Sequence, residues 1–235
     1  MKKLPQITAH TGCMGTPDNT IESSLTGIAA GAGLIEVDVQ SSADGIAFLF
    51  HDVLPVFQTA TLAELNHPDL RPWLSPLYKD RQLVTLEQLF EATMEADIRY
   101  NLDLKTAEAA GPAIEVIERM GMSQRVFFTG DTEGIEHGRD RVVWNTPADW
   151  NSTEWADNGE EVMQTCDRLT REGYFGLNMH YLACTEELVS YAHTKGLVVW
   201  VYTVDDPFYQ RKMIEMGVDA ITTCQVHTLR TLLEA

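Results

Sequence analysis

Basic residues are scarce in this sequence: 17 lysines and arginines stand against 35 aspartates and glutamates, a formal net charge of −18 at pH 7. Nucleic-acid binders need basic surface to displace counterions from phosphates, so we expect no nucleic-acid partner. The sequence also lacks an apolar run of the roughly 18 residues that cross a bilayer, so we expect no stable membrane insertion. Residues 1–6 carry two lysines with no apolar segment behind them, which predicts a cytoplasmic location.

Cysteine is scarce too. The four cysteines lie far apart, without C-x-x-C spacing, at Cys13, Cys166, Cys184 and Cys224. This spacing argues against a disulfide framework and against a zinc site built from thiolates. We therefore expect buried free thiols.

The composition is otherwise that of a globular protein, with 44% hydrophobic residues to supply a sizeable core. No linker, low-complexity tract or block of like charge divides the chain, so we predict a single domain over residues 1–235. The stretch from Asn66 to Asp80 contains three prolines and is predicted to be an irregular excursion.

Short apolar, β-branched runs alternate with helix-like segments along the chain. The runs are Gln6–Ala9, Leu34–Val39, Ile98–Leu104, Val126–Thr129, Val142–Trp144, Phe175–Asn178, Val198–Thr203 and Ala220–Thr223. Such alternation predicts an α/β fold of parallel strands covered by helices, one of which begins at the capping-box pattern Thr85 to Gln88. Eight units in 235 residues fit a (β/α)₈ TIM barrel, usually about 250 residues, but an open doubly wound sheet shares the pattern. The glycine-rich phosphate loops of open sheets are absent.

Acidic and imidazole side chains gather where the first three apolar runs end. His10 closes the first run, Glu36 and Asp38 lie in the second, and Asp103 and Lys105 close the third. Because side chains on a strand alternate with a period of two, Glu36 and Asp38 share one face, and so do Asp103 and Lys105. We expect these faces to point into the mouth of a barrel.

Three carboxylates buried together need a compensating positive charge. Oxygen ligands without cysteine or a local histidine pair suit Mg²⁺ or Ca²⁺ better than Zn²⁺. The alternative for each carboxylate is an ordinary salt bridge with Lys105 or an arginine. Both interpretations stay open at the level of the sequence.

A second histidine is predicted to reach the same rim. Asp44-Gly45 stands between two strand-like runs and is typical of a tight turn, which folds the chain back and brings His51 toward the carboxylates. Two histidines beside a metal suit phosphoryl chemistry, where one removes a proton from the attacking hydroxyl and the other protonates the departing alkoxide.

Five short motifs follow one another in the N-terminal part of the chain: His10-Thr11-Gly12, Pro17-Asp18-Asn19-Thr20, Glu36-Val37-Asp38-Val39, Asp44-Gly45 and His51-Asp52. Their order and spacing resemble the glycerophosphodiester phosphodiesterase family of the phospholipase C-like superfamily, whose pattern runs H-R-G, P-E-N-T, E-x-D-V, D-G and H-D. Later segments are similar as well, at Val84–Glu87, Asn101–Lys105, Tyr202–Asp205 and Gly217–Thr223. The resemblance thus covers nearly the whole chain.

The resemblance implies a TIM barrel and a set of site residues. It assigns Glu36, Asp38 and Asp103 to a divalent metal, Mg²⁺ or Ca²⁺, and His10 and His51 to general acid/base catalysis. It places the substrate against Lys105, Thr11, Asn19 and Tyr202. The implied reaction cleaves a small phosphodiester to glycerol 3-phosphate and an alcohol, and the candidates for the alcohol's pocket are Asn145, Asn178, His180 and Tyr202.

The sequence departs from the family pattern at several positions. Thr11 stands for the arginine of H-R-G, which removes a bidentate phosphate ligand. Asp103 is one methylene shorter than the usual third metal ligand, and Tyr202 replaces a tryptophan. Val53 to Asp80 lacks the R-T-T that follows H-D; its aromatic residues are expected either to cap the mouth of the barrel or to pack over its rim.

These features leave three hypotheses. The first is a metal-dependent phosphodiesterase acting on glycerophosphodiesters or related small diesters. The second, motivated by Thr11 and Asp103, is a catalytically weakened barrel that binds a glycerol phosphate or a diester without efficient turnover. The third is a lyase that cleaves lipid head groups, which the absence of an amphipathic basic segment disfavours. The sequence does not indicate an oligomeric state.

Overall fold

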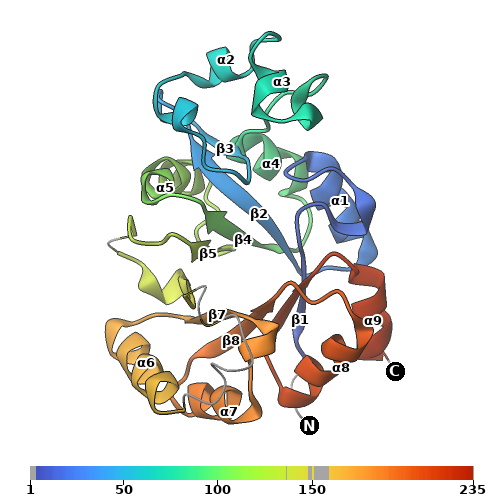
Figure 1. Ribbon diagram of the computed structural model, residues 1–235, viewed down its shortest axis with the longest axis vertical. Helices are drawn as coiled ribbons and strands as arrows, with labels where there is room; N and C mark the ends of the chain where they lie inside the picture. Colours follow the sequence, from blue (N-terminus) through green and yellow to red (C-terminus); the bar gives the residue numbers. More distant parts are fainter. Residues whose placement is uncertain (1–3, 136, 148–149, 151–158, 235) are drawn as a thin grey trace.

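Eight parallel strands form a nearly closed barrel in the computed structural model, which describes residues 4–135, 137–147, 150 and 159–234 (Figure 1). In spatial order they are β5 (Val126–Gly130), β4 (Arg99–Leu104), β2 (Leu34–Ser41), β1 (Gln6–Ala9), β9 (Ala220–Thr223), β8 (Val198–Tyr202), β7 (Gly176–His180) and β6 (Val143–Asn145). A parallel bridge between Phe128 and Val142 joins the two ends of this series. The predicted TIM barrel is confirmed.

Helices surround the barrel and connect its strands (Figure 1). They are α1 (Ile21–Ala30), α4 (Leu86–Thr93), α5 (Ala110–Arg119), α6 (Gly159–Glu172), α7 (Glu186–Thr194), α8 (Pro207–Met216) and α9 (Val226–Glu234), with short turns η1 (Cys13–Gly15), η4 (Ala107–Ala109) and η8 (Tyr181–Ala183). The predicted capping box is present at α4, where the Thr85 hydroxyl accepts from Gln88 N and the Gln88 side chain accepts from Thr85 N.

The alternation of side chains along β2 decides which of them face the barrel axis. Ile35, Val37 and Val39 pack in the apolar layer between strands and helices. Leu34 faces the other way, into a small inner core completed by Phe127, Val143, Trp200 and Ala220. Glu36 and Asp38 lie on the same inward face of β2 as Leu34, so β2 places two carboxylates at the mouth of the barrel.

The connection between β5 and β6 departs from the regular alternation of strands and helices that the sequence indicates. The described residues here, 131–135 and 137–142, contain one 3₁₀ turn, η5 (Arg139–Arg141), in place of an α-helix. The segment packs closely on η4, because a Cβ atom at Gly134 would lie 2.2 Å from the carbonyl oxygen of Ala107.

A hairpin and an excursion follow β2. The Asp44-Gly45 turn, with Gly45 at φ 76°, returns the chain as β3 (Ala47–Leu49), which pairs antiparallel with β2, as predicted. The excursion then forms η2 (Pro55–Gln58), α2 (Leu62–Leu65), α3 (Arg71–Leu74) and η3 (Pro76–Tyr78), which lie above the barrel in Figure 1. It has its own apolar cluster, including Phe48, Phe50, Phe57, Leu65, Leu74, Tyr78 and Leu83.

The cysteines are free, as expected, and Cys224 alone of the four is partly exposed. Among the described residues, no helix is both long and apolar enough to cross a membrane.

Candidate active site

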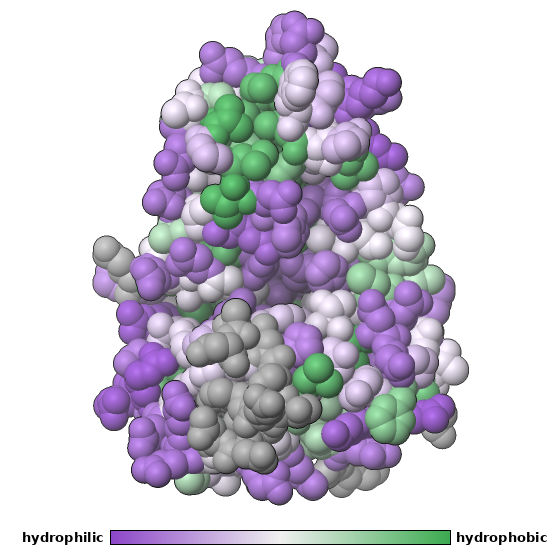
Figure 2. Space-filling model, viewed as in Figure 1, coloured by the Kyte–Doolittle hydropathy of each residue, from purple (hydrophilic) through white to green (hydrophobic). Residues whose placement is uncertain are grey.

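The carboxyl ends of the strands enclose a cavity of about 210 Å³. Figure 2 looks onto this face, where a hydrophilic hollow lies below the apolar surface of the excursion. The residues that line the cavity are His10, Glu36, Asp38, His51, Asn101, Asp103, Lys105, Thr129, Asn145, Asn178, Tyr202, Thr203 and Thr222. The fold thus brings together all the predicted catalytic, metal-binding and substrate-binding residues except Thr11 and Asn19.

The three predicted metal ligands converge. One carboxylate oxygen from each of Glu36, Asp38 and Asp103 lies within 4.8 Å of the other two. Asp38 and Asp103 lie opposite each other in the register of β2 and β4, and Glu36 lies two residues before Asp38 on the same face of β2. Burial, together with the neighbouring charge of Asp38, raises the pKa of Glu36 to about 7. The cluster therefore carries more negative charge than its surroundings balance.

Lys105 neutralises part of the negative charge of the carboxylate cluster. Its Nζ lies 2.7 Å from Asp38 Oδ1 and also contacts Asp103 Oδ2. Burial opposes the charged ammonium, but the carboxylates of Asp103 and Asp38 outweigh it and raise the Lys105 pKa above its ordinary value. The salt bridge considered at the level of the sequence is thus present for two carboxylates. With His10 neutral, three carboxylates and one ammonium leave two formal negative charges, and a proton on His10 beside Glu36 leaves one, so the cluster keeps an excess of negative charge for a cation to neutralise.

His10 stands beside Glu36 at the end of β1. Its Nδ1 donates to the carbonyl oxygen of Thr11 at 2.6 Å, and its Nε2 lies 3.8 Å from Glu36 Oε2. Burial disfavours the imidazolium and is the largest single effect on its pKa. The Glu36 carboxylate, with the hydrogen bonds that His10 makes to the Cys224 side chain and to the Thr11 carbonyl oxygen, outweighs burial and raises the pKa of His10 above 6.5.

Thr11 and Asn19 lie behind the carboxylates instead of facing the cavity. The backbone N–H of Thr11 donates to Glu36 Oε2 at 3.1 Å, and the Thr11 hydroxyl accepts from Asn19 N. Asn19 Nδ2 donates to Asp38 Oδ2 at 2.8 Å, and Asp38 N donates to Asn19 Oδ1 at 3.1 Å. Neither residue is among the described residues that line the cavity. Their contact with substrate stays a prediction.

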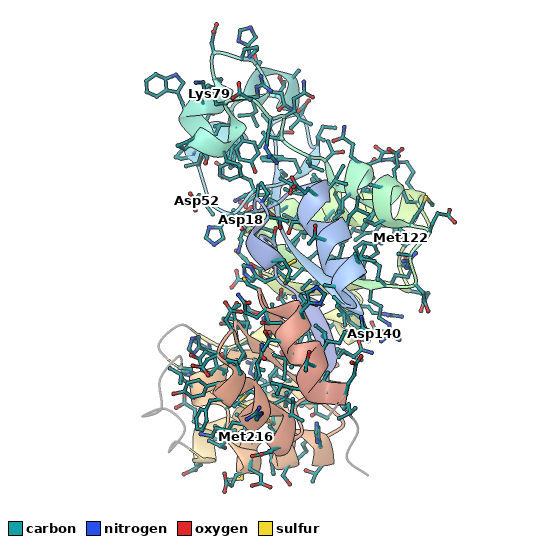
Figure 3. All side chains as sticks on the ribbon, turned by 90° about the vertical axis from the view of Figure 1, so that its right-hand side faces the viewer. Asp18, Asp52, Lys79, Met122, Asp140 and Met216 are labelled. Carbon is teal, nitrogen blue, oxygen red and sulfur yellow. The ribbon has the colours of Figure 1, made fainter. Side chains whose placement is uncertain are left out.

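His51 reaches the rim from the hairpin. Its Nδ1 donates to Asp52 Oδ1 at 2.7 Å. Gln40, buried at 2% exposure, holds this segment because its Nε2 donates to the carbonyl oxygen of Asp52 at 2.9 Å. Asp18 and Asp52 lie on the same edge of the molecule, at the left in Figure 3.

Several residues of this site were not predicted from the sequence. Thr129 donates to Asp103 Oδ1 and to Asn101 Oδ1, each at 3.0 Å. Asn101 and Gln40 share strand faces with Asp103 and Asp38, respectively, so the period of two gave a signal that could have found them. Thr129 comes from β5, and only the register of β4 with β5 places it opposite Asp103.

The other described residues that line the cavity are uncharged. Asn178 Nδ2 donates to Asn145 Oδ1 at 2.7 Å, and Tyr202 closes this side. His180 is not among the described residues that line the cavity; its ring meets Tyr202 edge-on at 6.2 Å between centroids, and burial lowers its pKa. No residue of the 53–80 excursion appears among the lining residues, so its described aromatic side chains do not shape the cavity wall.

The mouth of this barrel combines clustered carboxylates, a lysine and two histidines. Such a site suits a hydrolase that acts on anionic esters. A profile of the Glycerophosphoryl diester phosphodiesterase family matches residues 10–228, and the chain belongs to this family. The glycerophosphodiester phosphodiesterase of Caldanaerobacter subterraneus subsp. tengcongensis is 26% identical over 246 residues, 99% of this chain and 98% of that protein.

Solved structures agree on the fold. A glycerophosphodiester phosphodiesterase from Parabacteroides distasonis superposes with a TM-score of 0.77 at 24% identity, covering 100% of this chain and 98% of that one. An Oleispira antarctica phosphodiesterase, solved in complex with its product sn-glycerol-3-phosphate, has a TM-score of 0.74 at 23% identity, covering 99% and 98%. Together with its membership of the family and the curated relative, this makes the chain a glycerophosphodiester phosphodiesterase-like hydrolase.

Proposed function

We propose that this protein is a metal-dependent phosphodiesterase that hydrolyses glycerophosphodiesters, or related small diesters, to glycerol 3-phosphate and an alcohol. The observation that carries the proposal is the convergence of Glu36, Asp38 and Asp103 within one cavity that His10, His51 and Lys105 also line. The product bound to the Oleispira antarctica relative is the product that this reaction would release.

The carboxylates suit a hard divalent cation, because all three donors are oxygens and the cluster keeps an excess of negative charge. Glu36, Asp38 and Asp103 would hold Mg²⁺ or Ca²⁺, which supplies Lewis-acid stabilisation of a phosphoryl oxygen when bound. Lys105 adds a permanent positive charge near the phosphate, because its ion pairs keep it protonated. Together these groups attract an anion into a protein of net charge −18.

The two histidines would move the protons. His10 and His51 both line the cavity, so one can accept a proton from an attacking hydroxyl while the other donates to the leaving alkoxide. Thr129 holds Asp103 in place by its hydrogen bond to Oδ1. The uncharged wall formed by Asn145, Asn178 and Tyr202 offers amide and aromatic contacts to the part of the substrate away from the phosphate.

Hydrolysis of glycerophosphocholine and of bis(p-nitrophenyl) phosphate tests the proposal. With Mg²⁺ or Ca²⁺ we expect turnover that a chelator abolishes and that His10→Ala or His51→Ala each lowers by about 10²- to 10⁴-fold, the usual contribution of an acid/base group. His227→Ala, at an exposed position on α9, is the matched control and should keep its activity. Activity that survives both active-site histidine substitutions would overturn the proposal.

The second candidate is a weakened barrel that binds its ligand without efficient turnover. It is favoured by one observation: the Thr11 hydroxyl is engaged with Asn19, so nothing at this position takes the place of the family's arginine. Lys105 is the one lysine or arginine among the described lining residues. Calorimetric binding of glycerol 3-phosphate, with turnover no faster than that of the double-histidine variant, would establish this alternative.

A further inference from the structure

His51 is the more exposed of the two cavity histidines. Its side chain is 69% exposed, against 32% for His10. His51 also lies beyond the end of β3: the last ladder bond of the hairpin runs from Phe50 N to Asp38 O at 3.1 Å. The β-ladder therefore stops before it reaches the residue that would act on substrate.

Beyond the end of the β-ladder, the buried side chain of Gln40 ties the His51 segment to β2. Gln40 is two residues past Asp38 on β2, so it shares the inward face with both Asp38 and Glu36. Its Nε2 bond to the Asp52 carbonyl oxygen ties the segment after β3 back to the strand that carries two of the carboxylates. The Asp52 carboxylate in turn accepts from His51 Nδ1, which leaves Nε2 as the imidazole nitrogen available to a ligand.

We propose that Gln40 and Asp52 are positioning residues for His51: Gln40 fixes the main chain of the His51 segment against β2, and Asp52 fixes the imidazole tautomer and ring orientation. Neither residue touches the reacting atoms. The inference rests on the proposed function, because it assigns His51 a role in proton transfer. Its physical basis is that a catalytic group must be held within a fraction of an ångström of its productive position.

The kinetic test uses Gln40→Met, which keeps the length of the side chain but removes the donor, and Asp52→Ala. With either diester and saturating divalent cation, we expect kcat to fall about 10- to 100-fold, the effect of misplacing a reacting group by about 1 Å, with KM and the cation midpoint nearly unchanged. In a His51→Ala background both substitutions should lose this effect, because nothing remains for them to position.

Gln210→Met is the matched control. Gln210 is also fully buried, and its Nε2 donates to the Val204 carbonyl oxygen at 2.9 Å and to the Thr223 hydroxyl at 3.1 Å, not to the segment that carries His51. Any effect of this substitution on kcat should be the same with and without His51. Equal, additive effects of Gln40→Met in the two backgrounds would show a merely structural role and overturn the inference.

A second readout does not depend on turnover. In protein labelled at the histidine ring nitrogens, NMR should report Nδ1–H as the neutral tautomer of His51, and Asp52→Ala should mix the two tautomers. Gln40→Met should speed amide exchange at residues 50–53 and leave the Gln88-capped start of α4 unchanged. Absence of diester turnover in the wild type would overturn the proposed function alone, whereas an unchanged tautomer and unchanged exchange would overturn this inference.

Discussion

At the scale of single residues, Asn19 links groups that the sequence leaves far apart. Its amide makes two hydrogen bonds to Asp38, one to the carboxylate and one to the backbone N–H, and its own N–H donates to the Thr11 hydroxyl. Thr11 also bonds Glu36 through its backbone. Two of the three carboxylates are therefore oriented by one short network whose members do not face the cavity.

Removing the Asn19 amide should loosen the carboxylates. We expect Asn19→Gly to weaken Mg²⁺ or Ca²⁺ binding by about 10- to 100-fold, the usual cost of losing a residue that orients a metal ligand. Isothermal titration calorimetry of the metal-stripped protein measures this directly.

Asn19→Ala separates the amide from the backbone. Asn19 has φ 55°, in the left-handed region that asparagine and glycine tolerate better than alanine. The alanine variant should bind the cation as weakly as the glycine variant but unfold more easily, by roughly 1 kcal/mol in urea. Wild-type affinity in both variants would contradict the orienting role of Asn19.

The residue scale also shows what a sequence can reveal about this site. The convergence of Glu36, Asp38, Asp103, His10 and His51 was predictable, because strand periodicity and the Asp-Gly turn fix the face and direction of each side chain. The hydrogen bonds of Thr11, Asn19 and Gln40 were not predictable, since they depend on how the loop after β1 and the hairpin after β2 meet in space.

At the scale of secondary-structure elements, the apolar runs located every barrel strand to within a few residues, because both faces of a barrel strand are covered. In the structure α1, α4, α7 and α8 have capping side chains at Thr20, Thr85, Thr185 and Asp206, and the capping-box pattern in the sequence predicted the start at Thr85. The connection from β5 to β6 could not be predicted in detail, because no local helix signal marks it and its close approach to η4 at Gly134 depends on the tertiary fold.

Gly130, the last residue of β5, is an element-scale requirement of the site. It has φ 79°, and a Cβ atom there would lie 2.2 Å from the Leu104 carbonyl oxygen and 2.7 Å from Asp103 Oδ1. The end of β5 can therefore approach β4 only without a side chain. This close approach confines the carboxylate of Asp103.

Gly130→Ala should destabilise the fold by about 3 kcal/mol, since left-handed strain of about 1–2 kcal/mol adds to an overpacking cost of similar size. Gly121→Ala is the matched control, because Gly121 has φ 68° but open space around its Cβ position. Urea unfolding should show a loss of about 1–2 kcal/mol for the control, from the backbone term alone. Equal losses in the two variants would mean that β5 can move away from Asp103 without cost.

At the scale of the whole molecule, an acidic chain must stabilise an acidic centre. The net charge repels anions at long range, whereas inside the cavity Lys105 and a divalent cation, once bound to the carboxylates, would set the local potential. The free energy of unfolding should therefore depend on pH through the carboxylate cluster. Divalent cations should change that dependence.

The sign of this dependence follows from two raised pKa values. Glu36 rises from 4.5 to about 7 through burial and the charge of Asp38, and His10 rises from 6.5 to about 10 through Glu36 and hydrogen bonds that outweigh burial. In both cases the folded state binds its proton more tightly than the unfolded state does. The metal-free protein should thus lose stability as pH rises, through Glu36 between about 4.5 and 7 and through His10 between about 6.5 and 10.

A divalent cation should reverse this loss, because it replaces the proton on Glu36 and binds best when that carboxyl is ionised. We expect Mg²⁺ or Ca²⁺ to raise the thermal midpoint of chelator-treated protein more at pH 8 than at pH 5.5, measured by differential scanning fluorimetry. Glu36→Gln should flatten the pH dependence below pH 7 and shrink the cation effect, while the exposed Glu186→Gln on α7 should change neither. A cation effect that is as large at pH 5.5 as at pH 8 would show that these ions bind outside the carboxylate cluster.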